Sequence, residues 1–312
     1  MIALTHRRAV ATMLVVTLLW SIAGVVSRHL DSARSFEVTF WRAAANGVAL
    51  ALLLSWWRGP AQLWRSIREG GRTMALSALC WCVLFTSFML ALTMTTVANV
   101  LITMSLAPVF TALIARIVLG QRLPLRTWVA VVVAGIGIAW MYGSQVGGGS
   151  ASDLWGTLVA LTVPIAGATM WTLAQVNARA HPDERRDMTP AVLIGTTLSS
   201  LLMLALAWPL QASRHDVGLL VMLGVVQLAI PCVLAVAVGA VLKAPEASLL
   251  GLLEVLFGVA WTWLGSDEAP TPAVIGGGSL VLLALAANEA LALWGSRDEP
   301  ADRSGPGVTL QA

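Results

Sequence analysis

Charged residues are scarce in this chain of 312 residues: Asp, Glu, Lys and Arg make up 11%, and 58% of residues are hydrophobic. A water-soluble domain keeps about a quarter of its residues charged, because its surface must stay hydrated. The scarcity excludes an ordinary soluble fold and predicts a surface that faces lipid. The net charge of +3 is small and scattered along the chain, so we expect no nucleic-acid partner.

Cysteine and histidine are also rare, with three and four residues. Cys80, Cys82 and Cys232 lie in apolar runs without the spacing of a disulfide framework or a zinc site, so we expect buried thiols. No histidine falls inside an apolar run, and the chain contains no nucleophile motif, zinc-protease motif or ATP-binding loop. The sequence therefore predicts no enzyme, no metal site and no cofactor, and an intramembrane enzyme is the least favoured alternative.

Long apolar runs, by contrast, are abundant. A helix needs about 20 apolar residues to cross a bilayer. Ten runs meet this length: 9–27, 36–57, 73–92, 96–115, 125–142, 154–174, 189–208, 217–238, 245–264 and 272–294. The connectors between them are too short to hold a soluble domain. The last stretch, 295–312, is polar and rich in Gly and Pro, which predicts a disordered cytoplasmic tail.

Basic residues lie mainly in alternate connectors. If the N-terminus is cytoplasmic, that side collects most of the arginines, and the other side receives only Arg28, Arg34 and Arg214. Cytoplasmic loops of membrane proteins carry an excess of Lys and Arg. The pattern predicts a multi-pass protein of the bacterial cytoplasmic membrane with both termini in the cytoplasm.

A Gly/Ser-rich extracytoplasmic linker at 143–153 separates two halves, 1–142 and 154–294, with five expected spans each. "SIAG" at 21–24 matches "PIAG" at 164–167, and "LAPVF" at 106–110 matches "LEVLF" at 253–257. Because the number of spans per half is odd, matching helices cross the membrane in opposite directions, as in many secondary transporters. We predict an all-α membrane protein whose ten transmembrane helices form two inverted five-helix repeats.

Three further stretches carry a family resemblance: Trp20 followed by a small residue, "FWRAAANGVAL" around Arg42, and "LAPVFTALIARIVLGQRLP" at 106–124. Nearly the whole chain resembles the EamA branch of the drug/metabolite transporter superfamily, and within it the aromatic-amino-acid exporters. The resemblance implies outward transport of amino acids. One departure is that Val255 follows Glu254 where the family often has proline, which argues against a kinked ninth helix.

Two charged residues inside the expected spans are candidates for a binding site, Glu254 and Arg42. A carboxylate in mid-span costs at least about 2.5–3.5 kcal/mol on insertion scales, so Glu254 is expected to face the bundle interior. Three roles remain open for it: pairing with a cationic solute group, proton uptake, or a structural hydrogen bond between helices. Arg42 could bind a solute carboxylate or extend towards the interface.

Tryptophan is abundant, with fourteen residues against one Tyr and six Phe. Most lie at expected interface depths, whereas four lie deeper: Trp20, Trp81, Trp171 and Trp261. Indoles beside polar groups suit a flat or aromatic solute. Asn99 and Gln175 lie in spans four and six, where they could line a cavity or bond helices together.

These patterns predict a secondary transporter that works by alternating access through a cavity between the repeats. The family resemblance implies that it exports amino acids, aromatic ones foremost. The expected substrate-binding residues are Trp20, Arg42, Trp81, Asn99, Trp171, Gln175, Glu254 and Trp261. Glu254 would bind the ammonium, Arg42 or Asn99 the carboxylate, and the indoles the side chain. The alternative is a proton-coupled exporter of lipophilic cations. The expected partners are a small-molecule substrate, amino acids or other metabolites, and the lipid bilayer, with no protein partner required.

Overall fold

The computed structural model describes residues 5–27, 29–33, 35–95, 97–121, 123–143, 151–265 and 271–295. Within these ranges the chain is helical and contains no strand, which confirms the predicted all-α class. Most of the predicted linker and nearly all of the predicted tail lie outside the described residues. Residues 151–153, expected in the linker, already belong to a helix.

The helices of the first half are α1 (His6–Ser21), α2 (Ala23–Ser27), α3 (Ser35–Arg58), α4 (Pro60–Glu69), α5 (Gly71–Met94), α6 (Val97–Met104), α7 (Ala107–Leu119) and α8 (Leu125–Tyr142). Those of the second half are α9 (Ala151–Arg179), α10 (Thr189–Ala207), α11 (Arg214–Met222), the π-helix η3 (Leu223–Ala229), α12 (Ile230–Gly239), α13 (Ala244–Gly251), α14 (Leu253–Gly265) and α15 (Pro272–Gly295). A single 3₁₀ turn, η2 (Pro182–Glu184), lies between α9 and α10.

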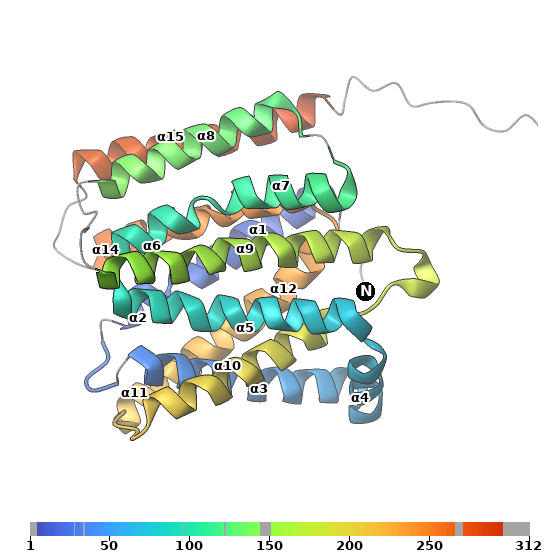
Figure 1. Cartoon of the computed structure of the whole chain (residues 1–312), viewed down its shortest axis with the longest axis vertical. Coiled ribbons are helices and arrows are strands. Elements are labelled where there is room, and N and C mark those ends of the chain that lie inside the picture. Colours follow the sequence, from blue (N-terminus) through green and yellow to red (C-terminus); the bar gives the residue numbers. More distant parts are fainter. Residues whose placement is uncertain are drawn as a thin grey trace, which may run out of the picture.

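Most helices run roughly parallel to one another, so the molecule is a bundle with two distinct ends (Figure 1). Helix α4 is short and turned across this direction. At one end α1 begins, α3 and α9 end, and α5 begins, and basic residues gather at these termini. We call this the arginine-rich end. Among the described residues, seven helical segments are long and apolar enough to cross a membrane, and shorter apolar helices cover 125–141 and 272–288.

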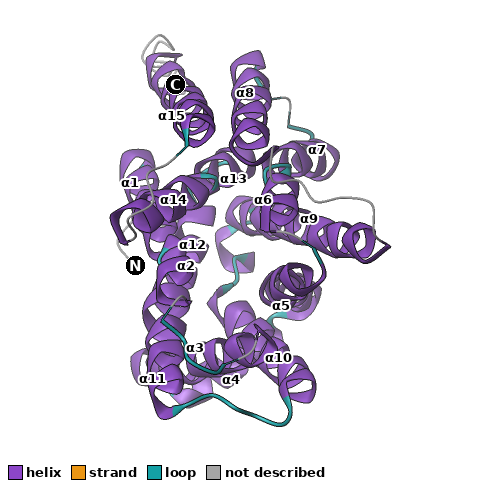
Figure 2. Cartoon of the chain, turned by 90° about the vertical axis from the view of Figure 1, so that its left-hand side faces the viewer, coloured by secondary structure: helices purple, strands orange, loops and turns teal. Residues whose placement is uncertain are grey.

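The pair α8 and α15 forms one edge of the bundle, as the end-on view shows (Figure 2). Glycine makes this contact close: a Cβ on Gly137 would lie 2.6 Å from the carbonyl oxygen of Gly277. The hydroxyl of Thr127 also donates to the side-chain oxygen of Asn288, at 3.1 Å. Small residues and a buried polar contact are the usual means of holding helices together in lipid, where the hydrophobic effect between helices is lost.

Three expected spans are interrupted. The first breaks at Ile22, the fourth at 105–106 and the ninth at Leu252. Pro108 lies in the first turn of α7, where its missing N–H costs no helical bond. The ninth span is interrupted although no proline directly follows Glu254: α13 ends at Gly251, and the N–H of Leu252 donates to the carbonyls of Leu249 and Leu250. Glycine in a helix interior is about 1 kcal/mol less favourable than alanine, so Gly251 is a favourable position for the helix to end.

Candidate functional site

The site begins with a distortion of the eighth span. Pro231 has no N–H to donate to the carbonyl of Gln227, four residues earlier, and a proline ring clashes with that carbonyl in a regular helix. The chain widens into the π-helix η3 just before this proline, and the N–H of Ile230 reaches back five residues to the carbonyl of Val225. Single π-helical turns often occur at functional sites. The distortion turns the side chain of Gln227, 4% exposed, into the bundle.

Gly224 brings this π-helix against α3. A Cβ at position 224 would lie 2.6 Å from both the carbonyl oxygen of Arg42 and the Cβ of Ala45. Only a residue without a side chain fits such a crossing. As a result Gln227 reaches Arg42, whose Nη2 donates a hydrogen bond of 2.7 Å to the Gln227 Oε1. The amide nitrogen of Gln227 donates in turn to the main-chain oxygen of Trp20, at 3.1 Å.

Trp20 lies where the first span breaks. Because α1 ends at Ser21, the carbonyl of Trp20 can accept from Gln227, and the Trp20 indole lies within hydrogen-bonding reach of the Cys232 thiol. The indole of Trp261 donates to the Ser21 hydroxyl at 3.0 Å, and that hydroxyl donates to the carbonyl of Leu18 at 2.7 Å. The break is therefore tied to the eighth span by Gln227 and to the ninth span by Trp261.

Arg42 keeps one hydrogen-bond donor unused. Its Nε–H is buried and has no acceptor among the described residues, although Nη2 is bound by Gln227. The side chain as a whole is half-buried. A buried guanidinium donor without a partner loses a charge-assisted hydrogen bond worth about 1.5–3 kcal/mol. An anionic ligand with an oxygen at this position would supply the bond.

Glu254 is the opposite charge in this region. It is half-buried in the first turn of α14, where the helix dipole favours a negative charge. Glu254 and Arg42 interact electrostatically, yet these two described residues form no ion pair within 4.0 Å. Helices α3 and α14 thus bring Arg42 and Glu254 close enough to interact electrostatically, but the two side chains form no direct ion pair.

Four of the predicted residues therefore meet at one place: Trp20, Arg42, Glu254 and Trp261. Their surroundings contain three residues that the sequence reasoning did not select for the site: Gln227, Cys232 and Ser21. A lone glutamine four residues before a proline, within an otherwise apolar run, was the available signal for Gln227. The close approach of Cys232 needs the fold.

The other four predicted residues have structural contacts of their own. Trp81, 3% exposed, stacks on Phe85 with ring centroids 5.6 Å apart, and Trp171 packs against the backbone at Gly239. Gln175 accepts a 3.0 Å hydrogen bond from the N–H of Ala244, at the start of α13. The amide of Asn99 donates to the Thr95 hydroxyl at 2.8 Å. Their predicted role in binding stays a prediction.

Two buried carboxylates lie near the end of the bundle opposite the arginine-rich end. Glu37 accepts from the main-chain N–H groups of Gln211 and Ala212, at 3.0 and 2.8 Å. Asp216, which is fully buried, accepts from the N–H groups of Asp31, Ser32, Ala33 and Ser213, and from the Ser32 hydroxyl. These residues, Glu37 and Asp216, form what we call the loop clasp, because they fasten the α2–α3 connection to the α10–α11 connection.

A triad of possible metal ligands lies at the loop clasp. Ligand atoms of Asp31, His215 and Asp216 fall within 4.8 Å of one another. The oxygens of Asp216 are already occupied by the hydrogen bonds that cap the two loops, and His215 Nδ1 is 3.4 Å from the Asp31 carboxylate. We interpret the cluster as an exposed ion pair beside a cap rather than a metal centre.

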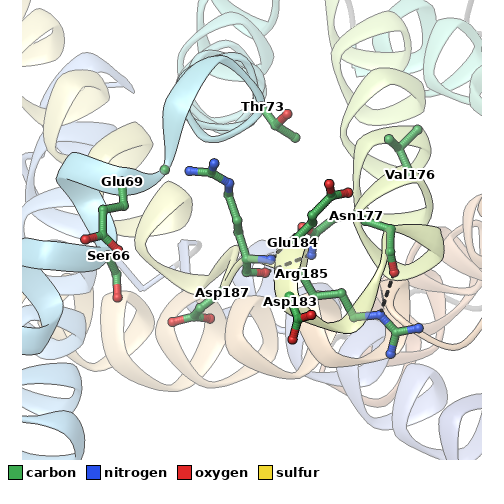
Figure 3. A pocket seen from close by; sticks show the side chains of 12 residues that line it. Ser66, Glu69, Thr73, Val176, Asn177, Asp183, Glu184, Arg185 and Asp187 are labelled. Carbon is green, nitrogen blue, oxygen red and sulfur yellow. Dashed lines mark hydrogen bonds between the residues drawn. The ribbon is translucent and has the colours of Figure 1, made fainter.

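A pocket of about 710 Å³ opens at the arginine-rich end, between the α4–α5 junction and the α9–α10 connection (Figure 3). Its lining is charged and includes Glu69, Asp183, Glu184, Arg185 and Asp187. Asn177 braces one wall, because its side chain both donates to and accepts from the main chain of Arg186. Asp187 pairs with Arg58 at the end of α3. This pocket is separate from the Arg42–Glu254 region.

A helical bundle with several membrane-length apolar segments defines a multi-pass membrane protein. Residues 7–143 match the family described as the EamA-like transporter family. The first half of the chain is therefore similar to this transporter family. This match supports the expected place in the drug/metabolite transporter superfamily.

A crystal structure described only as that of a protein superposes on the chain with a TM-score of 0.74 and 19% sequence identity. The alignment covers 93% of this chain and 99% of the other. At this identity the likeness shows the fold alone. The comparison with curated proteins gives no match.

Proposed function

We propose that the protein is a secondary transporter that exports amino acids, aromatic ones foremost, by alternating access through the Arg42–Glu254 region. The observation that carries the proposal is a pair of opposite, half-buried charges in mid-bundle that attract each other without forming a direct ion pair. Structural ion pairs in membranes normally close, because an unpaired charge is costly there. An open pair suits a zwitterion, whose carboxylate meets Arg42 and whose ammonium meets Glu254.

Helix pairing supports the inverted repeat on which the proposal depends. If spans one to five correspond to spans six to ten, the contact of α5 with α9 corresponds to that of α12 with α1, and both are present. The contact of α7 with α9 likewise corresponds to that of α14 with α1. The pairs α3–α10, α7–α13 and α8–α15 join corresponding spans directly, as a two-fold axis requires.

The helix breaks add to this support. Spans four and nine are interrupted at corresponding places, before Ala107 in one half and before Leu253 in the other. Substrate sites of inverted-repeat transporters are typically formed by such discontinuous helices near the midplane, with the N-termini of half-helices facing the bound ion or solute. Glu254 lies in the first turn of one of these half-helices. The flat faces of Trp20 and Trp261 nearby favour an aromatic solute.

The test is efflux of labelled tryptophan from proteoliposomes that contain the protein. We expect Glu254→Gln and Arg42→Gln to lower efflux about tenfold or more, because each removes a charge-assisted contact of about 1.5–3 kcal/mol. Glu69→Gln, on exposed α4, is the matched control and should transport normally. Wild-type liposomes that release tryptophan no faster than empty ones would refute the proposal. Transport of a lipophilic cation instead, dependent on a pH gradient, would favour the alternative of a cation exporter.

A further inference from the structure

The contact between Arg42 and Gln227 has a role that transport of a zwitterion alone does not require. We propose that Gln227 is a positioning residue: it holds Arg42 away from Glu254 and aims the free Nε–H of Arg42 at the solute carboxylate. This inference rests on the proposed function and adds a residue, supplied by the second half of the chain, that determines whether a carboxylate is recognised.

The first argument is the geometry of the guanidinium. One of its nitrogens, Nη2, is bound at 2.7 Å by an oxygen that is itself fixed, since the same amide donates to the main chain of Trp20. Because both ends of its amide are bound and its side chain is buried, Gln227 cannot rotate without losing a hydrogen bond. One nitrogen of the Arg42 guanidinium, Nη2, is therefore occupied, while its Nε–H has no acceptor among the described residues.

The second argument is electrostatic. Arg42 and Glu254 attract each other across the bundle interior, where a low dielectric constant makes the attraction between opposite charges stronger than in water. Without an anchor, a long arginine side chain would be expected to close onto the carboxylate. A closed ion pair would satisfy both charges and leave nothing for a zwitterion to bind. Gln227 supplies the neutral acceptor that keeps the pair open.

The third argument is the local backbone, which departs from regular α-helix to bring the Gln227 side chain to Arg42. A π-helical turn, a proline four residues later and a glycine at van der Waals limit against α3 all combine to bring this one side chain to Arg42. A regular helix in the same place would turn the side chain elsewhere, since each residue rotates by about 100° along an α-helix.

The experiment uses the purified full-length protein and two probes that each carry half of the zwitterion. Indole-3-propionate has the carboxylate without the ammonium, and tryptamine has the ammonium without the carboxylate. Binding is measured as the ligand-induced rise in melting temperature, and as competition against tryptophan efflux. Gln227→Leu is compared with Gln227→Glu and with Ser199→Ala, which removes a buried polar contact between α5 and α10 away from this region.

If Gln227 positions Arg42, Gln227→Leu should weaken binding of indole-3-propionate about tenfold to a hundredfold and leave tryptamine within about twofold. Gln227→Glu should weaken it at least as much, because a carboxylate at this position competes for Arg42. The double variant Gln227→Leu, Glu254→Gln should recover most of the indole-3-propionate binding, since no acid remains for Arg42 to close onto. Ser199→Ala should bind both probes normally.

Equal losses for both probes in Gln227→Leu, or no loss for either, would overturn the inference. So would a double variant that binds indole-3-propionate no better than the single one. If the proposed function itself is wrong, the wild-type protein transports no tryptophan. Binding of the two probes to wild-type and variant proteins can still be compared by melting temperature in that case, so the two failures are distinguishable. A folding defect is recognised because it lowers the melting temperature without any ligand.

Discussion

The crossing of η3 over α3 provides a sharp test of how packing builds the site. Replacing Gly224 by alanine adds a Cβ that would lie 2.6 Å from the Arg42 carbonyl oxygen, 2.6 Å from the Ala45 Cβ and 3.1 Å from the Asn46 nitrogen. Two of these three atoms belong to the backbone of α3, so no rotamer change can relieve the contact. Overpacking of this kind costs about 1–3 kcal/mol.

A matched control lies six residues earlier in the same span. A Cβ on Gly218, in α11, would meet nothing within 4 Å. Alanine there should be neutral or stabilising by up to about 1 kcal/mol, because glycine is a poor helix former. The two substitutions are chemically identical, so the difference between them isolates the crossing.

The assay is thermal unfolding of the purified protein, followed by tryptophan efflux. Gly224→Ala should melt at least a few degrees lower than Gly218→Ala, given about 2–4 °C per kcal/mol for chains of comparable length. It should also lower efflux, because the π-helix must move away from α3 and the 2.7 Å contact between Gln227 and Arg42 lengthens. A Gly224→Ala protein that melts and transports like Gly218→Ala would refute the reasoning from packing to site.

Two other predictions follow from buried contacts. Asp216→Asn should lower the melting temperature by an amount corresponding to about 2–3 kcal/mol, because the charge that accepts four main-chain N–H groups is lost and one donor is left facing the new amide; an unchanged melting temperature would show that the loop clasp does not stabilise the fold. In a Cys80→Ala, Cys82→Ala background, the fully buried Cys232 thiol should react slowly with a polar maleimide. If the nearby Trp20 lines the solute path, added tryptophan should change the rate of this reaction. Equal rates with and without tryptophan would count against a solute path beside Trp20.

The positions of the helices could be predicted from the sequence because long apolar runs have few alternatives in lipid. Each of the ten expected runs coincides with described helix, although three of them are interrupted and only seven segments meet the length and hydropathy expected of a membrane span. The inverted repeat stays a prediction, supported by the helix pairing. Arg42 and Glu254 could be selected from the sequence because a charged side chain inside an apolar run raises the free energy of membrane insertion and therefore indicates a functional role.

The parts that could not be predicted depend on distances between spans. Gln227 meets Arg42 only because η3 and α3 cross at Gly224, and no pattern within either run reveals that crossing. The break at Leu252 could not be predicted, because no proline lies next to it in the sequence. The sequence places Gln175 in the candidate site because it shares one face of span six with Trp171, whereas in the structure its oxygen accepts a hydrogen bond from the N–H of Ala244, at the start of α13.

These contacts suggest how to separate structural from functional polar residues in such a bundle. Three buried side chains accept hydrogen bonds from main-chain N–H groups at loop and helix ends: Glu37, Asp216 and Gln175. Loss of any of these acceptors would leave a main-chain N–H without a hydrogen-bond partner. Asn46 is an intermediate case, since its amide donates to Thr196 while its oxygen has no partner among the described residues, but it is uncharged and fully buried. Arg42 differs from all of them, because it combines a formal charge, a partly exposed side chain and a buried Nε–H donor that has no acceptor among the described residues. Such an arrangement is costly in a membrane unless a ligand completes it during part of the transport cycle. We therefore propose that Arg42, rather than the better-bonded acids, marks the place where solute binds.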